Sequence, residues 1–106
     1  MGWLVYGNPE WRIDFDDRVL AHLQIAVMTK IRRNEAFQMS WHNDKASTGR
    51  TAIWLHPAIP IMFQFSGSRE PTINRAWVSL LVQSASSSAG LRVLPEPPAD
   101  SGATTP

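Results

Sequence analysis

Apolar and polar residues alternate along most of the chain, which is typical of strands buried on one face. An apolar run over 3–6 and an alternating run over 11–14 flank a Gly-Asn-Pro turn and predict two strands. Three further runs, over 37–42, 50–56 and 61–65, alternate with a period of two and predict three more strands. We expect the last three to form part of an antiparallel sheet with one buried face.

The period changes to a helical one between these two groups of strands. Apolar residues recur every three or four positions behind an acidic start and ahead of a basic end, which predicts a helix over 17–33. We expect Asp16 to cap its first amides and Asp17 to interact with the helix dipole. Phe15 is expected to pack on Leu20 and so to fix the direction in which the chain enters the helix.

A second helix and a last short strand complete the predicted fold. Pro71 is followed by two candidate caps, Thr72 and Asn74, and then by apolar residues at helical spacing. The apolar side of this helix is expected to consist of Trp77, Leu80, Leu81 and Val82. Residues 91–94 are expected to form a strand. Residues 95–106 contain four prolines and no large apolar side chain, and we expect a disordered tail there.

The predicted order of elements is β-β-α-β-β-β-α-β. Each helix carries a single apolar stripe, so each needs one sheet face to cover. We therefore predict an α+β fold in which a mostly antiparallel sheet carries both helices on one face. A chain of 106 residues is long enough for one modest core and too short for two. We expect a single domain over residues 1–94.

The alternation assigns one face of the sheet to the core and the other to solvent. If the odd-numbered residues over 37–41, 51–55 and 61–65 face the helices, the even-numbered ones face away. Pairing the last two of these strands across their short link would place Trp54 opposite Met62 on the outer face. We expect a binding surface there that comprises Arg12, His42, Arg50, Trp54, His56, Met62 and Arg92.

An outer face of this composition has three interpretations. Apolar surface exposed on a sheet is typical of protein contacts, so our first hypothesis is a non-enzymatic module that binds a protein partner or a second copy of itself. Alternatively, Trp54 stacks on a base while Arg12, Arg50 and Arg92 contact phosphate, as in a nucleic-acid-binding accessory protein. In the third interpretation, Trp54 and Met62 only stabilise the sheet through cross-strand packing.

The first helix offers a second, mixed surface. Its polar side is expected to contain His22, and Ile25 lies among these polar residues. This arrangement fits a partner helix, although scattered surface hydrophobes are normal. The basic cluster of Lys30, Arg32 and Arg33 suits a phosphate, but compensation of the helix dipole explains it without any partner.

Composition excludes several kinds of chemistry. The chain has a net charge of +1 and so lacks the strong positive charge of an obligate nucleic-acid binder. Because it contains no cysteine, it has no disulfide, thiol nucleophile or thiolate metal site. His22, His42 and His56 lie on different elements, so we expect no metal site and no cofactor. The chain lacks a Gly-x-Ser-x-Gly elbow, a glycine-rich phosphate loop and a long apolar run. We expect a soluble, cytoplasmic protein that does not bind membranes.

Several short strings of residues are distinctive. They include Met1-Gly2, Asp17-Arg18-x-Leu20-Ala21-His22-Leu23, Ile53-Trp54-Leu55-His56-Pro57, Asn74-Arg75-x-Trp77 and Leu94-Pro95-Glu96-Pro97. Together they resemble a family of small actinobacterial proteins of unknown function, and the resemblance extends over nearly all of residues 1–97. It implies no catalytic residue and no cofactor.

Members of this family often carry the label "ATP-dependent DNA ligase", which the sequence can test. Adenylating ligases resemble one another in a Lys-x-Asp-Gly motif whose lysine attacks ATP. Here Lys30 precedes Ile-Arg-Arg and Lys45 precedes Ala-Ser-Thr, so neither lysine fits the motif. We therefore expect no ligase catalysis, and the label leaves only an accessory role beside DNA enzymes.

Overall fold

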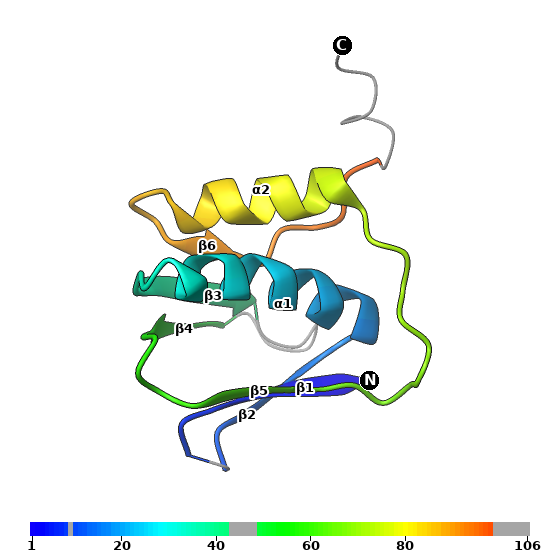
Figure 1. The fold of residues 1–106 in the computed structure, drawn as a ribbon, viewed down its shortest axis with the longest axis horizontal. Helices are drawn as coiled ribbons and strands as arrows, with labels where there is room; N and C mark the ends of the chain where they lie inside the picture. The colour runs from blue at the N-terminus through cyan, green and yellow to red at the C-terminus, as the bar shows by residue number, and fades with distance from the viewer. Residues whose placement is uncertain (9, 43–48, 99–106) are drawn as a thin grey trace.

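The residues that the structure describes form two three-stranded sheets and two helices (Figure 1). The computed structural model describes residues 1–8, 10–42 and 49–98. The elements are β1 (Gly2–Tyr6), β2 (Arg12–Phe15), α1 (Asp17–Arg32), β3 (Phe37–His42), β4 (Arg50–Leu55), β5 (Ile61–Gln64), α2 (Arg75–Ala85) and β6 (Leu91–Arg92). This order confirms the predicted α+β class and the predicted succession of elements.

The strands are divided between two sheets, whereas we expected one. β1 pairs antiparallel with β2 and β5, and β3 pairs antiparallel with β4 and parallel with β6. The predicted pairing of β4 with β5 is therefore wrong: Trp54 lies opposite Gln38, and Met62 lies opposite Val5. The short link between the two strands carries the chain from one sheet to the other. A period of two defines the buried face of a strand but does not identify its neighbour.

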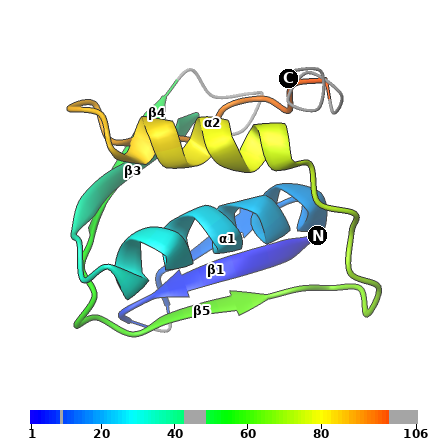
Figure 2. The same ribbon diagram turned by 45° about the horizontal axis from the view of Figure 1, so that its top comes forward.

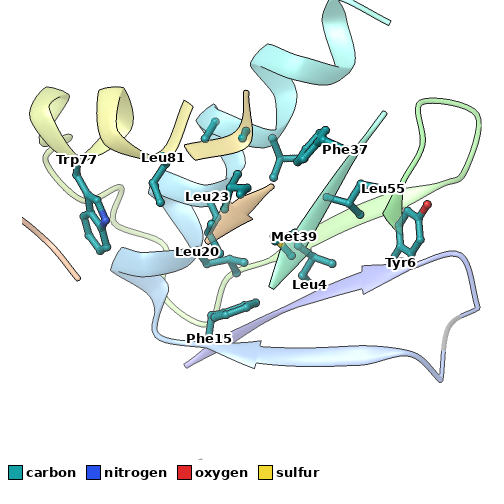
Figure 3. Packing of buried hydrophobic residues seen from close by; sticks show 14 residues of the cluster. Leu4, Tyr6, Phe15, Leu20, Leu23, Phe37, Met39, Leu55, Trp77 and Leu81 are labelled. Atoms are coloured by element: carbon teal, nitrogen blue, oxygen red, sulfur yellow. The ribbon is translucent and has the colours of Figure 1, made fainter. Parts of the chain in front are cut away.

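The two helices lie side by side and cover the inner faces of the sheets (Figure 2). α1 contacts β1, while α2 contacts β3 and β6. The core between them comes from every layer and includes Leu4, Phe15, Leu20, Leu23, Met39, Leu55, Trp77 and Leu81 (Figure 3). Because each helix stripe and each inner sheet face contributes side chains, a single cluster supports the whole fold.

The predicted alternation of buried and exposed residues is confirmed except at Ser40, which was expected to face solvent and is only 4% exposed. Phe37, Met39 and Leu55 are at most 4% exposed, whereas Trp54 is 60% and Met62 is 49% exposed. The core of the fold is therefore formed by the odd-numbered side chains of these strands, and Trp54 contributes little to it.

α1 begins with Asp17, as predicted, but its start is held in a different way. Asp16 stands at the cap position and its side chain makes no capping hydrogen bond. The carboxylate of Asp17 instead accepts hydrogen bonds from the amides of Gly67 at 3.0 Å and Ser66 at 3.2 Å. These bonds lower the pKa of Asp17, and the bond from Gly67 has the largest effect. They also hold the segment after β5 against the start of the helix.

α2 begins after Asn74, one of the two predicted caps. Its side-chain oxygen accepts hydrogen bonds from the amides of Ala76 and Trp77. Trp77 and Leu81 are buried as predicted, but Leu80 is 37% exposed and does not belong to the buried side. Ala85 completes that side instead, because it follows Leu81 by four residues.

Candidate functional site

The outer face of the β4-β3-β6 sheet brings four of the seven predicted binding residues together. Across β3 and β4, His42 lies opposite Arg50, Ser40 opposite Ala52, and Gln38 opposite Trp54. On the other side of β3, Ser40 lies beside Arg92 of β6. We call this surface the basic face; its exposed residues are Gln38, His42, Arg50, Ala52, Trp54 and Arg92, and Ser40 lies buried among them.

The basic face carries positive charge without matching carboxylates. None of the residues of β3, β4 and β6 is acidic. Arg50 and Arg92 are exposed, and within the described ranges neither forms an ion pair. An anionic group that approaches this face therefore meets two guanidinium groups that no carboxylate among the described residues neutralises.

Trp54 presents an exposed side chain on a firmly held backbone. Its carbonyl accepts a hydrogen bond of 2.8 Å from the hydroxyl of Tyr6, and that hydroxyl accepts one of 3.0 Å from the amide of His56. Tyr6 belongs to the other sheet, so these bonds join the two sheets at this corner. The indole is thus positioned by the fold and still 60% exposed.

A hollow of about 350 Å³ lies beside Trp54, between the C-terminal ends of the two helices. Lys30 lines it, and its ammonium group donates a hydrogen bond of 3.1 Å to the Ser86 hydroxyl and pairs with Glu35. This pairing lowers the pKa of Glu35. Lys30 is only 7% exposed, so it does not form a surface cluster with Arg32 and Arg33 as the sequence suggested.

Three of the predicted binding residues lie away from the basic face. Arg12 is on β2, where its guanidinium lies 4.1 Å from the ring centre of Trp3 and donates to the Asp14 carboxylate at 3.3 Å. Met62 is on β5 in the same sheet. His56 follows β4, and its Nδ1 accepts a hydrogen bond from the amide of Ala58. The seven residues therefore do not form one continuous sheet surface, because β4 and β5 belong to different sheets.

His22 occupies a position that the sequence did not predict: it is fully buried. Its Nε2 accepts a hydrogen bond of 2.8 Å from the amide of Asn74, so Nδ1 carries the proton and donates to the carbonyl of Arg18 at 2.7 Å. The centre of the imidazole ring lies 4.5 Å from that of Trp77. His22 thus joins the two helices instead of facing solvent.

This histidine belongs to a polar group that we call the Glu96 cluster. The cluster consists of Arg18, His22, Asn74 and Glu96. The Arg18 guanidinium donates to both carboxylate oxygens of Glu96, at 2.8 and 2.6 Å. The Asn74 amide donates to Glu96 at 2.9 Å and to the carbonyl of Pro97 at 2.9 Å. The bonds from Arg18 and then from Asn74 lower the pKa of Glu96 to about 2.

The Glu96 cluster corrects the predicted start of the tail. Residues 95–98 lie against the helices, and the expectation of disorder from Pro95 onward is wrong for them. Hydrogen bonds and an ion pair hold this segment, so its lack of large apolar side chains does not prevent ordering. The expectation for residues 99–106 lies outside the described residues.

The described ranges contain no group of three His, Asp or Glu side chains that could hold a metal ion. Both ring nitrogens of His22 already have partners, and His42 lies in β3 whereas His56 follows β4. Neither helix within these ranges is long and apolar enough to span a membrane.

Comparison with known proteins yields one match. The sequence model of a domain of unknown function, DUF7882, matches residues 1–96. No curated protein and no solved structure matches the chain. The match covers every element of the fold and ends at Glu96, the residue that Arg18 and Asn74 bind.

Proposed function

We propose that this chain, which belongs to the DUF7882 family of unknown function, is a non-enzymatic binding module that contacts a protein partner through the basic face. The observation that carries this proposal is the position of Trp54, which is 60% exposed on a face that the core does not need. Tryptophan and arginine are enriched among the residues that dominate protein interfaces. The rigid backbone at Trp54 supports such a role because little ordering is required on binding.

The same geometry gives less support to catalysis. The charged groups beside the hollow, Lys30 and Glu35, are paired with each other. The basic face is a sheet surface, whereas catalytic sites are usually enclosed clefts. A binding role in the cytoplasm is the function we propose.

Replacing Trp54 tests this proposal. Trp54→Ala removes the exposed indole, and we expect it to abolish capture of the partner in a pull-down from host lysate while the circular dichroism spectrum stays unchanged. Trp11→Ala is the matched control, because Trp11 is 62% exposed and lies in the turn before β2. The proposal fails if both variants capture the same proteins as the wild type.

A second candidate, binding of single-stranded nucleic acid, is favoured by one observation: the strands of the basic face contain no acidic residue and two arginines that form no ion pair with any residue the structure describes. A base stacked on Trp54 with phosphates near Arg50 and Arg92 would use all three side chains.

Fluorescence polarisation with a labelled single strand tests this second candidate. We expect the wild type to bind the strand with an affinity that falls as the salt concentration rises. Arg50→Gln and Arg92→Gln should each weaken this binding. Arg12→Gln serves as the control, because Arg12 lies on the other sheet and is paired with Asp14. Absence of binding at low salt would remove this candidate.

A further inference from the structure

We propose that the partner presents an extended acidic segment to the basic face, with acidic side chains at two alternate positions and an aromatic side chain at the next. This inference rests on the proposed function, because it names the kind of protein that the basic face binds. It is carried by the order of Arg50, Arg92 and Trp54 along the sheet and by the charge of the strands that present them.

The three side chains follow one another at regular intervals along the strand direction. Arg92 and Ala52 lie on opposite sides of Ser40, so they stand at the same level of the sheet. On β4, Arg50 lies two residues before Ala52 and Trp54 lies two residues after it. Two residues of a strand span about 6.7 Å. Arg50, Arg92 and Trp54 are therefore reached in this order, at steps of about 6.7 Å along the sheet.

An extended segment has the same repeat. Its alternate side chains point to one face, and they too are about 6.7 Å apart. A segment that runs along the sheet can therefore direct one side chain to Arg50, the next on that face to Arg92 and the third to Trp54. The complementary groups are two carboxylates for the guanidinium groups and an aromatic ring for the indole. The resulting pattern is acidic-x-acidic-x-aromatic, in either chain direction.

The residues at the centre of the basic face allow this approach. Ala52 is exposed and small, so the backbone of a segment can lie close to β4 between Arg50 and Trp54. Arg92 is two strands away, at about 4.8 Å per strand. Only Ser40 stands between Arg92 and Ala52, and it is small and 4% exposed. The long Arg92 side chain can therefore extend across β3 to the same segment.

The charge of this sheet favours an acidic occupant. β3, β4 and β6 contain no acidic residue, and Arg50 and Arg92 form no ion pair with any residue that the structure describes. Two other arginines of the fold, Arg12 and Arg18, each bind a carboxylate of their own chain. On the basic face the corresponding carboxylates have to come from another molecule, and such charge complementarity gives an interface its specificity.

The segment lies on the face of the sheet and not along its edge. The Tyr6 hydroxyl occupies the edge of β4 at the carbonyl of Trp54 and the amide of His56. The segment is therefore recognised through side chains, which makes the bound pattern specific in sequence. A single nucleic-acid strand shares the negative charge, but a net charge of +1 favours a ligand that needs only two charges neutralised.

Peptide titrations followed in the amide NMR spectrum of the full chain test the inference. The probe is a synthetic peptide with the sequence Asp-Ser-Asp-Ser-Tyr between Gly-Ser flanks. We expect it to shift the signals of β3, β4 and β6 with a dissociation constant below about 1 mM. The rearranged peptide Asp-Asp-Ser-Ser-Tyr has the same composition but keeps only one carboxylate on the face of the tyrosine. We expect it to bind about threefold more weakly, since one exposed ion pair is lost.

Variants of the basic face identify the residues that bind the peptide. Trp54→Ala should raise the dissociation constant about tenfold or more, because aromatic anchors dominate interfaces. Arg50→Glu combined with Arg92→Glu should lose the acidic peptide and instead bind Lys-Ser-Lys-Ser-Tyr, which the wild type should not bind. Arg69→Glu combined with Arg75→Glu is the matched control, because both arginines are exposed and lie outside the basic face. It changes the net charge equally and should bind the acidic peptide as the wild type does.

Three results would overturn the inference. The first is the absence of any shift on the basic face at about 1 mM acidic peptide. The second is equal binding of the rearranged peptide, since the spacing of the side chains would then be irrelevant. The third is an equal loss of binding in the control variant, or no binding of the lysine peptide to the charge-reversed variant. Circular dichroism spectra that match the wild type establish that the variants compared are folded.

The pull-down separates this inference from the function on which it rests. Capture that requires Trp54 but persists in the variant with Arg50→Glu and Arg92→Glu contradicts an acidic partner and leaves the binding module intact. Capture that does not depend on Trp54 contradicts both. A wild type that binds a labelled single strand and not the acidic peptide overturns the inference in favour of the nucleic-acid candidate.

Discussion

Arg18, in the Glu96 cluster, is bound by the residues around it, whereas Arg50 lies on the basic face, whose side chains do not bind it. In the Glu96 cluster, Arg18 donates to both oxygens of Glu96 and to the carbonyl of Thr72. On the basic face, Arg50 has no carboxylate in its own sheet. The first arrangement stabilises the fold, because a charge with partners holds segments together. The second leaves interaction capacity for another molecule, so the two regions should respond differently to substitution.

The largest effect on stability is expected at His22, the buried member of the Glu96 cluster. His22→Leu leaves the buried Asn74 amide without its partner and removes the side-chain hydrogen bond to the Arg18 carbonyl. We expect the free energy of unfolding to fall by about 3 kcal/mol, because unpaired buried polar groups are costly. Urea denaturation followed by circular dichroism measures this change. A loss below about 0.5 kcal/mol would contradict the role that we assign to the histidine.

Asn74→Ala should have the next largest effect. The variant removes the cap of α2 and both hydrogen bonds to the 96–97 segment. The expected loss is about 1–2 kcal/mol, which is the usual contribution of a capping side chain. Asn74→Ser provides a comparison, since serine keeps a capping oxygen but has no amide donor to Glu96 and adds no charge beside that carboxylate. It should therefore recover part of the loss, and a variant as unstable as Asn74→Ala would argue that the cap is unimportant.

The ion pair at Glu96 should make stability depend on acidic pH. The pKa of Glu96 falls from 4.5 to about 2 on folding, because Arg18 and Asn74 bind its carboxylate. The contribution of the ionised Glu96 to the free energy of unfolding is therefore complete above pH 4.5. It is lost as the pH falls from 4.5 toward 2.

Glu96→Gln isolates this contribution. The variant should be less stable than the wild type at pH 7, and the difference should shrink as the pH falls toward 2. Asp17 and Glu35 also have lowered pKa values, but they are unchanged in the variant and cancel in the comparison. Urea midpoints measured for both proteins across this range provide the test. Parallel curves would show that Glu96 is not paired in solution.

The regular part of the fold could be predicted because it depends on local periodicity. The spacing of Leu20, Leu23 and Val27 predicts α1, and the alternation of Phe37, Met39 and Trp41 predicts the buried face of β3. Both signals arise within a few residues. The exposure of Trp54 follows from the same alternation, and the structure confirms it.

The features that could not be predicted depend on neighbours far apart in the chain. α1 is buried on two sides, against β1 and against α2, and His22, Ala26 and Lys30 form a second line at four-residue spacing. His22 contacts Trp77 and Lys30 contacts Ser86, so this line faces α2. A search for apolar residues alone misses such a line, because two of its members are polar. The small side chain of Ala26, between His22 and Lys30, is the feature of the sequence that indicates this second buried line.

The site was only partly predictable for the same reason. Alternation indicated correctly that Trp54 and Met62 face away from the core, but no local signal shows that β4 and β5 belong to different sheets. Four of the predicted residues come together because β3, β4 and β6 are neighbours. Arg92 joins this group through a parallel pairing of β6 with β3, which links segments about fifty positions apart.

The smallest effect on stability is expected on the basic face. Arg50→Gln removes an exposed charge that has no ion pair among the described residues. We expect the free energy of unfolding to change by less than about 0.5 kcal/mol, as is usual for surface substitutions. Arg18→Gln is the matched control, because it removes the same group from the Glu96 cluster. It should destabilise the protein measurably, and the two urea midpoints should therefore separate. If Arg50→Gln proved as destabilising as Arg18→Gln, the arginine would support the fold, and the contrast between the two regions would be lost.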